Sequence, residues 1–274
     1  MPKWAQIYIE GLIVLAWLSS TAWIFHLHPM TRVVVATPAA MLTEWLAPAS
    51  VLPTSFSVLE ALSKGRCLGK EVVFNQGECG ACLAFATATA FGMRACLQGG
   101  ATFANHVPSP FRLFDCAGGD CARNTGLNAQ GVMRVMVQHG VPLLTEAAAT
   151  FGQGCPQQQQ QANQSTLKVQ RYQYVCGRQP IKREVMERGP GVLSMRVSES
   201  AMQDEAKVRE GRLEHGLSLA DTHHALVLLG WLDEQDTWLV QNSWSSSWGV
   251  QGVGTVPQSL FDCVLVFEPS LIAH

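Results

Sequence analysis

One segment constrains the fold of this chain more than any other. In residues 81–97 (ACLAFATATAFGMRACL), small and apolar side chains fill nearly every position. Such a segment predicts a buried helix, because it offers no polar face to solvent and contains many good helix formers. Residues 76–82 (QGECGAC) come directly before it and place Cys82 in the first helical turn. We therefore expect a domain built around a central helix that begins at a thiol.

Cys82 has the surroundings that catalysis by a thiol requires. The positive end of the helix dipole and a nearby imidazolium both lower the pKa of a thiol and yield thiolate near neutral pH. Catalysis also needs a proton-carrying histidine and a group that orients it. His224 opens an apolar segment and Asn242 closes the next one, so neighbouring strands can bring them together. The adjacent His223 is expected to face solvent.

The remaining pattern predicts helices first and strands afterwards. Gly140 and Pro142 end a helix at residues 127–139, and a Gly-Pro pair ends another near residues 181–188. Short β-type runs follow at residues 192–197, 225–232, 237–241, 252–256 and 263–267. Helices followed by strands indicate an α+β fold in two lobes.

Cysteine count and charge narrow the functional classes. Nine cysteines after a hydrophobic leader suggest an oxidising compartment, and the odd count leaves one thiol unpaired. The chain has one CxxC, formed by Cys79 and Cys82, without the second pair that a zinc site needs. We expect no metal and no cofactor. The formal net charge of −2, without a basic run, argues against a nucleic-acid partner.

The leader is apolar from residue 7 to residue 25 apart from Glu10 and a Ser-Ser-Thr cluster. Three alternatives are a retained signal anchor, a cleaved signal peptide and a buried core helix. Length favours the anchor, because a secretory h-region has ~7–15 residues and a spanning helix about 20. We expect residues 1–28 to be a transmembrane helix and residues 29–51 a linker. Residues 52–274 would then form a domain in a lumenal or extracellular compartment of unspecified organelle, where Asn163 is a candidate glycosylation site.

The motifs around the candidate residues resemble the papain family of cysteine peptidases. Cys79-Gly80-Ala81-Cys82 fits the family's active-site signature. His224 follows Cys82 by 224 − 82 = 142 positions, within the ~130–150 typical of that family, and Asn242 lies just beyond. The resemblance implies a left helical lobe and a right lobe like a β-barrel.

The resemblance also implies a role for each site residue. Cys82 would attack the peptide carbonyl, His224 would carry the proton and Asn242 would orient His224. Gln76 would stabilise the oxyanion together with the Cys82 backbone N–H. Trp244 would shield the His–Asn hydrogen bond from water.

A closer likeness is to the cathepsin B branch. Residues 52–56 (LPTSF) resemble that branch's mature N-terminus, and residues 184–190 (EVMERGP) resemble its approach to the second lobe. Cys67 and Cys96 flank the motif at the branch's characteristic offsets, which implies a disulfide. The same resemblance implies two further pairs and leaves a fourth without family precedent: Cys79–Cys121, Cys116–Cys155 and, as the remainder, Cys176–Cys263.

Four departures from the family pattern bear on activity. Leu83 replaces an aromatic residue, and residues 122–126 (ARNTG) replace a Gly-Gly pair. The stretch from Cys121 to Cys155 is too short for the cathepsin B occluding loop, which predicts an endopeptidase. Only 51 residues precede Leu52, so no inhibitory propeptide of ordinary length is expected.

Three functional hypotheses follow. The first is a membrane-anchored cysteine endopeptidase that acts on peptides or proteins. The second is a catalytically silent papain-fold subunit that serves as a scaffold, with protein partners in a membrane assembly. The third, a redox CxxC pair of Cys79 and Cys82, is the weakest because the histidine and asparagine downstream would have no role.

Overall fold

The structure is a computed structural model of the 274-residue chain. It describes residues 52–64, 67, 73–147, 149–155, 166–198, 200, 204–213, 216 and 222–270. The chain divides into a unit of residues 1–51 and a unit of residues 52–274, and only the second contains described residues. The expected anchor, the linker and Asn163 therefore lie outside them. Within the described residues, no helix has the length and apolar character needed to span a bilayer.

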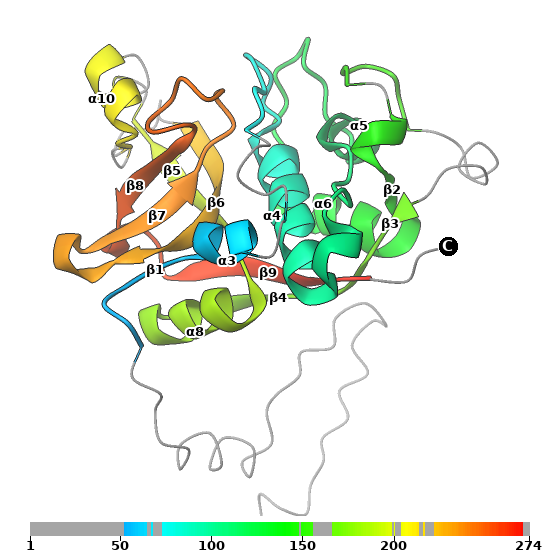
Figure 1. The fold of residues 1–274 in the computed structure, drawn as a ribbon. Helices are drawn as coiled ribbons and strands as arrows, with labels where there is room; N and C mark the ends of the chain where they lie inside the picture. The colour runs from blue at the N-terminus through cyan, green and yellow to red at the C-terminus, as the bar shows by residue number, and fades with distance from the viewer. Residues whose placement is uncertain are drawn as a thin grey trace, which may run out of the picture. The chain divides into compact units, whose positions relative to one another are not determined.

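Helices form one lobe of the described unit, on the right in Figure 1. The predicted central helix is α4, which extends to Gly99 and is buried along nearly its whole length. It ends where Gly100 adopts a φ of 73°, a conformation that a side chain disfavours. The elements of this lobe are α3 (Val58–Lys64), α4 (Cys82–Gly99), η2 (Gly100–Phe103), α5 (Pro110–Cys116), α6 (Ala129–Arg134), η3 (Val135–His139) and η4 (Leu144–Glu146).

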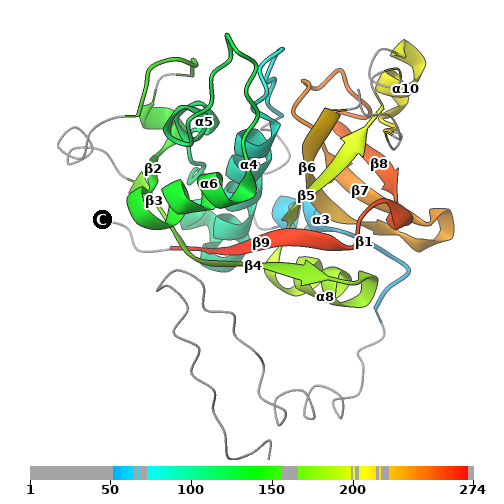
Figure 2. The same cartoon turned by 180° about the vertical axis from the view of Figure 1, so that it is seen from behind.

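An antiparallel sheet forms the other lobe, seen from both sides in Figures 1 and 2. The strand order is β4-β9-β5-β6-β7-β8, with β1 paired to β6, so among the described strands the sheet stays open between β8 and β4. The strands are β1 (Ser55–Ser57), β4 (Val169–Cys176), β5 (Gly191–Val197), β6 (Thr222–Leu232), β7 (Thr237–Gln241), β8 (Val253–Pro257) and β9 (Cys263–Pro269).

Shorter elements complete the described unit. The helix α8 packs against β4 and β6, and β2 pairs with β3. These elements are β2 (Val141–Pro142), β3 (Thr166–Leu167), α8 (Arg178–Arg188), α10 (Glu205–Glu210), η5 (Asp233–Gln235) and η6 (Gln258–Leu260). The predicted helix at residues 127–139 is divided: α6 passes into a π-helical turn, η3, before Gly140 ends both.

A buried arginine fixes the central helix to the sheet lobe. Arg94 on α4 is 0% exposed, and its guanidinium donates hydrogen bonds to the carbonyls of Gly189, Pro190 and Phe267. It also pairs with the Glu184 carboxylate on α8 at 2.8 Å. Every bond reaches across to another element, and loss of one partner would leave a buried charge uncompensated. The helix that begins at Cys82 is thus held in one position against the sheet.

Four disulfides are formed, and their pairs are those named from the sequence. Three of them hold loops around α4 and α5, and the fourth joins register partners on β4 and β9. The pairs are Cys67–Cys96, Cys79–Cys121, Cys116–Cys155 and Cys176–Cys263. Cys82 is the one free cysteine among the described residues.

Candidate active site

Cys82 is the first residue of α4, so its sulfur lies at the helix N-terminus. Burial raises the pKa of the Cys82 thiol, while hydrogen bonds from the backbone N–H groups of Ala225, Leu83 and Cys82 itself oppose that shift. The contact with Ala225 brings the thiol to the residue that follows His224. The sequence predicted thiolate near neutral pH, but burial outweighs the N–H donors and favours the neutral thiol as the resting form.

His224 and Asn242 form one hydrogen-bonded unit. His224 lies near the start of β6, and Asn242 directly follows β7, the strand paired with β6. His224 Nε2 and Asn242 Oδ1 are 2.8 Å apart, and the Ser243 backbone N–H donates to the same Oδ1 at 2.8 Å. Because a backbone N–H can only donate, the oxygen of the Asn242 amide faces both groups. His224 Nε2 therefore carries a proton, and Nδ1 of the neutral ring is left as an acceptor.

The imidazole of His224 is enclosed by the protein. Its burial lowers the pKa of His224 to about 4, and the hydrogen bond with Asn242 only partly offsets this. The Trp244 ring lies 4.6 Å from the His224 ring, centroid to centroid, with an angle of 31° between the planes. The Trp244 ring thus packs against the imidazole.

Gln76 joins the segment before Cys82 to the turn after Asn242. Its backbone N–H donates to the Ser243 carbonyl at 2.9 Å, and the Ser243 hydroxyl donates to Gln76 Oε1 at 2.6 Å. Gln76 Nε2 donates to the Cys79 carbonyl at 2.8 Å. An amide nitrogen has two hydrogens, so one remains for a ligand in the cleft. Hydrogen bonds thus hold both the oxygen and the nitrogen of this side-chain amide.

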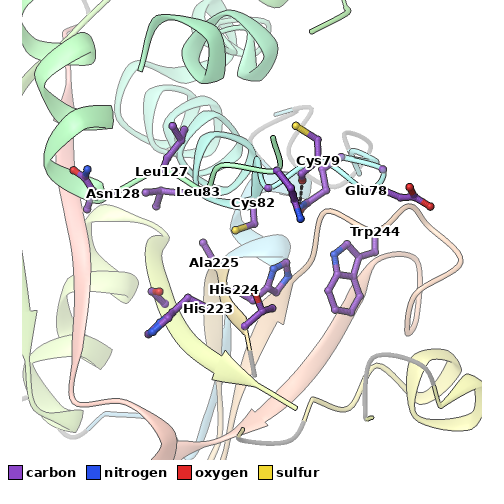
Figure 3. Close-up of a pocket in the computed structure, with 18 of the residues that line it drawn as sticks. Glu78, Cys79, Cys82, Leu83, Leu127, Asn128, His223, His224, Ala225 and Trp244 are labelled. Atoms are coloured by element: carbon purple, nitrogen blue, oxygen red, sulfur yellow. Dashed lines mark hydrogen bonds between the residues drawn. The ribbon is translucent and has the colours of Figure 1, made fainter. Parts of the chain in front are cut away.

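These residues border a single cleft of about 730 Å³. Figure 3 shows Cys82 opposite His224, with Leu83, Leu127 and Asn128 on one side of the thiol and Trp244 on the other. Gln76, Cys82, His224 and Trp244 line the cleft, whereas Asn242 lies behind His224. The exposed His223 also borders it.

Several lining residues were missed in the sequence, among them Tyr174 and Ser194. Tyr174 lies on β4, a strand that was not predicted from the sequence. Tyr172 and Tyr174 alternate with the polar residues Arg171 and Gln173, and this period of two is the signal that marks an edge strand.

The loop that departs from the family pattern borders the cleft. The Asp120 carboxylate accepts hydrogen bonds from the N–H groups of Ala122 and Arg123, and Thr125 pairs with Asp120 across the loop. Asn124 adopts a φ of 48° and lines the cleft, as Gly126 does. The loop thus places a polar side chain, that of Asn124, at the border of the cleft, and Leu83 borders the cleft as well.

The positions of the cysteines and of the other possible metal ligands bear on two alternatives to a thiol site, a redox pair and a metal site. Cys79 is bonded to Cys121, so the hypothesis of a Cys79–Cys82 redox pair is wrong. In the part of the chain that the structure describes, no three His, Cys, Asp or Glu side chains are grouped to hold a metal ion.

The two lobes and the cleft between them define a papain-like α+β fold. Among solved structures, procathepsin B S9 from Trypanosoma congolense aligns with a TM-score of 0.64 and 19% identity, over 81% of this chain and 79% of that one. Xylellain, a cysteine protease from Xylella fastidiosa, aligns with a TM-score of 0.59 and 20% identity, over 80% of this chain and 87% of that one. Residues 62–265 match the papain family cysteine proteases. The chain therefore belongs to the papain family.

Curated relatives include proteins of the cathepsin B type. A cathepsin B-like cysteine proteinase 2 of Haemonchus contortus is 32% identical over 85 residues, which are 30% of this chain and 24% of that protein. Mouse (Mus musculus) cathepsin O is 28% identical over 192 residues, 67% of this chain and 58% of that protein. The resemblance to papain-family, cathepsin B-like peptidases is confirmed. The chain spans less than two thirds of the length of either relative.

Proposed function

We propose that the chain is a cysteine endopeptidase that hydrolyses peptide bonds in protein or peptide substrates. The observation that carries this proposal is the fixed tautomer of His224. Asn242 holds the proton on Nε2, which leaves Nδ1 free to accept the proton of the one free thiol among the described residues, Cys82. A nucleophile, a base and a group that orients the base are the three parts that thiol catalysis needs.

The first step moves a proton and forms a bond. Burial favours the neutral form of both groups, because it raises the pKa of Cys82 and lowers the pKa of His224 to about 4. Transfer of the thiol proton to His224 Nδ1 creates a thiolate and an imidazolium without changing the net charge of the cleft. The thiolate then attacks the carbonyl carbon, and the carbonyl π electrons move to its oxygen.

Residues that are already held in place would stabilise the oxyanion and protonate the leaving group. The Cys82 backbone N–H and the remaining hydrogen of Gln76 Nε2 would donate to the oxyanion. The imidazolium of His224 gives its proton to the leaving amine as the C–N bond breaks, which leaves an acyl-thioester on Cys82. Water then loses a proton to His224 and attacks the thioester, releasing a carboxylic acid and restoring the thiol.

The cleft supports cleavage within a chain rather than at its end. Lining residues lie on both sides of Cys82, with Leu127 and Asn128 on one side and Glu78 and Trp244 on the other (Figure 3). A substrate can therefore extend past the thiol in both directions. The short stretch between Cys121 and Cys155 supports the same conclusion, because it leaves no room for an occluding loop.

The compartment follows from the cysteines. Four disulfides are typical of an oxidising lumenal or secreted environment. We further propose that residues 7–25, outside the described residues, anchor the domain to a membrane. Alkaline carbonate washing of membranes tests this, because an anchored full-length chain stays in the pellet. Release into the wash, or a mature chain that begins after residue 25, would contradict the anchor.

Covalent labelling tests the proposed activity. An epoxide or vinyl-sulfone inhibitor of papain-type enzymes should label the folded protein at Cys82, and Cys82→Ala should abolish labelling. The matched control is His139→Gln, which changes an exposed histidine that does not line the cleft and should be labelled like the unmodified protein. An absence of labelling across pH ~4–8 would favour the catalytically silent scaffold, for which the side chain of Asn124 in the cleft is the supporting observation.

A further inference from the structure

A small cavity of about 10 Å³ lies beside Asn242, between α4, β6 and the end of β7. It is separate from the cleft that Cys82 borders. A cavity of about this volume holds one water molecule when polar groups line it. Four of its lining residues are polar, namely Thr89, Gln241, Asn242 and Ser243. The cavity therefore has both the size and the lining that an ordered water requires.

Asn242 brings a hydrogen-bond donor without a partner to this cavity. Its side-chain oxygen is held by His224 Nε2 and by the Ser243 backbone N–H. The other branch of the amide, Nδ2, is buried and has no hydrogen-bond partner among the described residues, and Asn242 as a whole is only 3% exposed. A buried N–H group without a partner is destabilising, because it has lost its hydration. A water in the cavity can accept a hydrogen bond from Nδ2 and remove that cost.

Thr89 borders the same cavity from the central helix. It follows Cys82 by 89 − 82 = 7 positions, or about two turns of an α-helix, so the two residues lie on one face of α4. Phe85 and Ala86, three and four positions after Cys82, border the cavity from that face as well. The Thr89 hydroxyl can accept or donate a hydrogen bond. A water between Thr89 and Asn242 would thus connect the helix that carries the thiol to the residue that holds the imidazole.

A second threonine on α4 provides a comparison. Thr87 is also buried, and its hydroxyl has no hydrogen-bond partner among the described residues. Thr87 does not line the cavity, however, whereas Thr89 does. Two positions along a helix correspond to a rotation of about 200°, so the two side chains leave α4 in nearly opposite directions. Proximity to the cavity, and not burial on α4, is therefore what distinguishes Thr89.

We propose that this cavity holds one ordered water molecule and that Thr89 is a positioning residue that acts through it. The water would accept a hydrogen bond from Asn242 Nδ2 and donate one to Thr89 Oγ1. With both branches of its amide held, Asn242 would keep the orientation that places a proton on His224 Nε2. The effect of Thr89 on turnover rests on the proposed peptidase function, whereas the water and its hydrogen bonds do not.

Substitutions of the two threonines test the positioning role in the full-length protein. Thr89→Val keeps the shape of the side chain and removes its hydroxyl, so kcat on a fluorogenic peptide should fall about 3- to 10-fold while KM stays nearly constant. Thr89→Ser keeps the hydroxyl and should retain kcat within about twofold. Thr87→Val is the matched control and should leave kcat unchanged. An unchanged kcat in Thr89→Val, an equal loss in Thr87→Val, or an equal loss in Thr89→Ser would each overturn the positioning role.

Crystallography and NMR test the water without any need for turnover. A high-resolution crystal structure of the unmodified protein should show one water within hydrogen-bond distance of Asn242 Nδ2 and Thr89 Oγ1. The NMR signal of the His224 Nε2–H proton should shift in Thr89→Val and stay in place in Thr87→Val. A cavity filled by neighbouring side chains, or a water that does not contact Thr89, would overturn the proposal. If the water and the shift were found in a protein that neither cleaves peptides nor reacts with the inhibitor, the peptidase function would fall and the positioning of Asn242 by Thr89 would stand.

Discussion

The two sides of the cleft are held in place by different means. On the side that carries Cys82, the proposed nucleophile, three disulfides bind loops to the helical lobe, and one of them, Cys79–Cys121, ends three residues before Cys82. We call this the nucleophile side. On the other side, which we call the base side after the proposed base, His224 lies near the start of β6 and Asn242 follows its partner strand β7, and a hydrogen bond joins the two side chains. The fourth disulfide lies at the far edge of the sheet, on β4 and β9.

The difference follows from the local structure on each side. Residues 73–81, before Cys82, have almost no regular secondary structure, so no ladder of hydrogen bonds fixes their path. The β6–β7 ladder, in contrast, fixes the backbone on both sides of the His–Asn pair. The nucleophile side should therefore be sensitive to reduction, whereas the base side should be sensitive to single polar substitutions. Four predictions test this contrast.

The largest effect is expected from His224→Gln. Loss of the base should lower kcat/KM by about 10²- to 10⁴-fold, the usual contribution of general acid–base catalysis. His139→Gln, on an exposed histidine that does not line the cleft, should change kcat/KM by less than about twofold. Steady-state kinetics on a fluorogenic peptide provides the measurement. If the two variants lost activity equally, the base would be misassigned.

Two disulfide deletions compare the sides directly. Cys79→Ser/Cys121→Ser and Cys176→Ser/Cys263→Ser should each reduce the free energy of unfolding by about 2–5 kcal/mol. The chain-entropy effect should be slightly larger for the second pair, which closes 87 residues rather than 42. Labelling of Cys82 should slow by about 10²-fold only in Cys79→Ser/Cys121→Ser, because only this variant frees the segment that precedes Cys82. Urea unfolding and alkylation rates, measured where both variants are folded, give the two quantities. Equal loss of labelling would contradict the contrast.

The fold could be predicted from the sequence where periodicity and stop signals were strong. The strand at residues 237–241 was predicted with its observed bounds, and the helix at residues 81–97 was predicted to within two residues of α4. Edge strand β4 was missed because its outer positions are exposed, so its apolar alternation is weak. Tyr174 was missed with it, since membership of the cleft depends on register across three strands.

The site was predicted unevenly for the same reason. Cys82, His224 and Gln76 lie in local motifs, so the sequence could name them as candidates before any geometry was known. The hydrogen bonds of Ser243 to Gln76 could not be predicted, because they join segments that are far apart in the chain. The catalytic roles of Cys82, His224 and Gln76 stay predictions.

The burial of His224 predicts a dependence of stability on pH. The pKa of His224 is about 4 in the folded protein and near 6.5 in the unfolded chain, so the unfolded state binds more protons between these values. Stability should therefore be fully present above pH ~6.5 and fall as the pH drops toward 4, by up to about 3 kcal/mol. The same protonation blocks the base, so kcat/KM should fall below pH ~4.

The measurement is the free energy of unfolding in urea from pH 4 to pH 8. His224→Gln removes the titrating group, so its stability should change less over this range than that of the unmodified protein. His223→Gln should keep the full dependence. If the free energy of unfolding of His224→Gln still fell steeply with decreasing pH, another group would cause the loss of stability. The enclosed imidazole of His224 would then not explain the pH dependence.

The smallest effect is expected from Ser243→Ala, which removes one bond between the two sides. The buried Ser243 hydroxyl donates to Gln76 Oε1 at 2.6 Å, so its loss should cost about 1 kcal/mol of stability. Because Gln76 would then be held less firmly, kcat should fall by about 3- to 10-fold, while KM stays nearly constant. Ser246→Ala, on an exposed serine of the same turn, is the matched control and should change neither quantity. A rise in KM with kcat unchanged would mean that Ser243 contributes to substrate binding instead. In that case the segment that contains Gln76 would position its side chain without the hydrogen bond from Ser243. The geometry of the nucleophile side would then not depend on the base side.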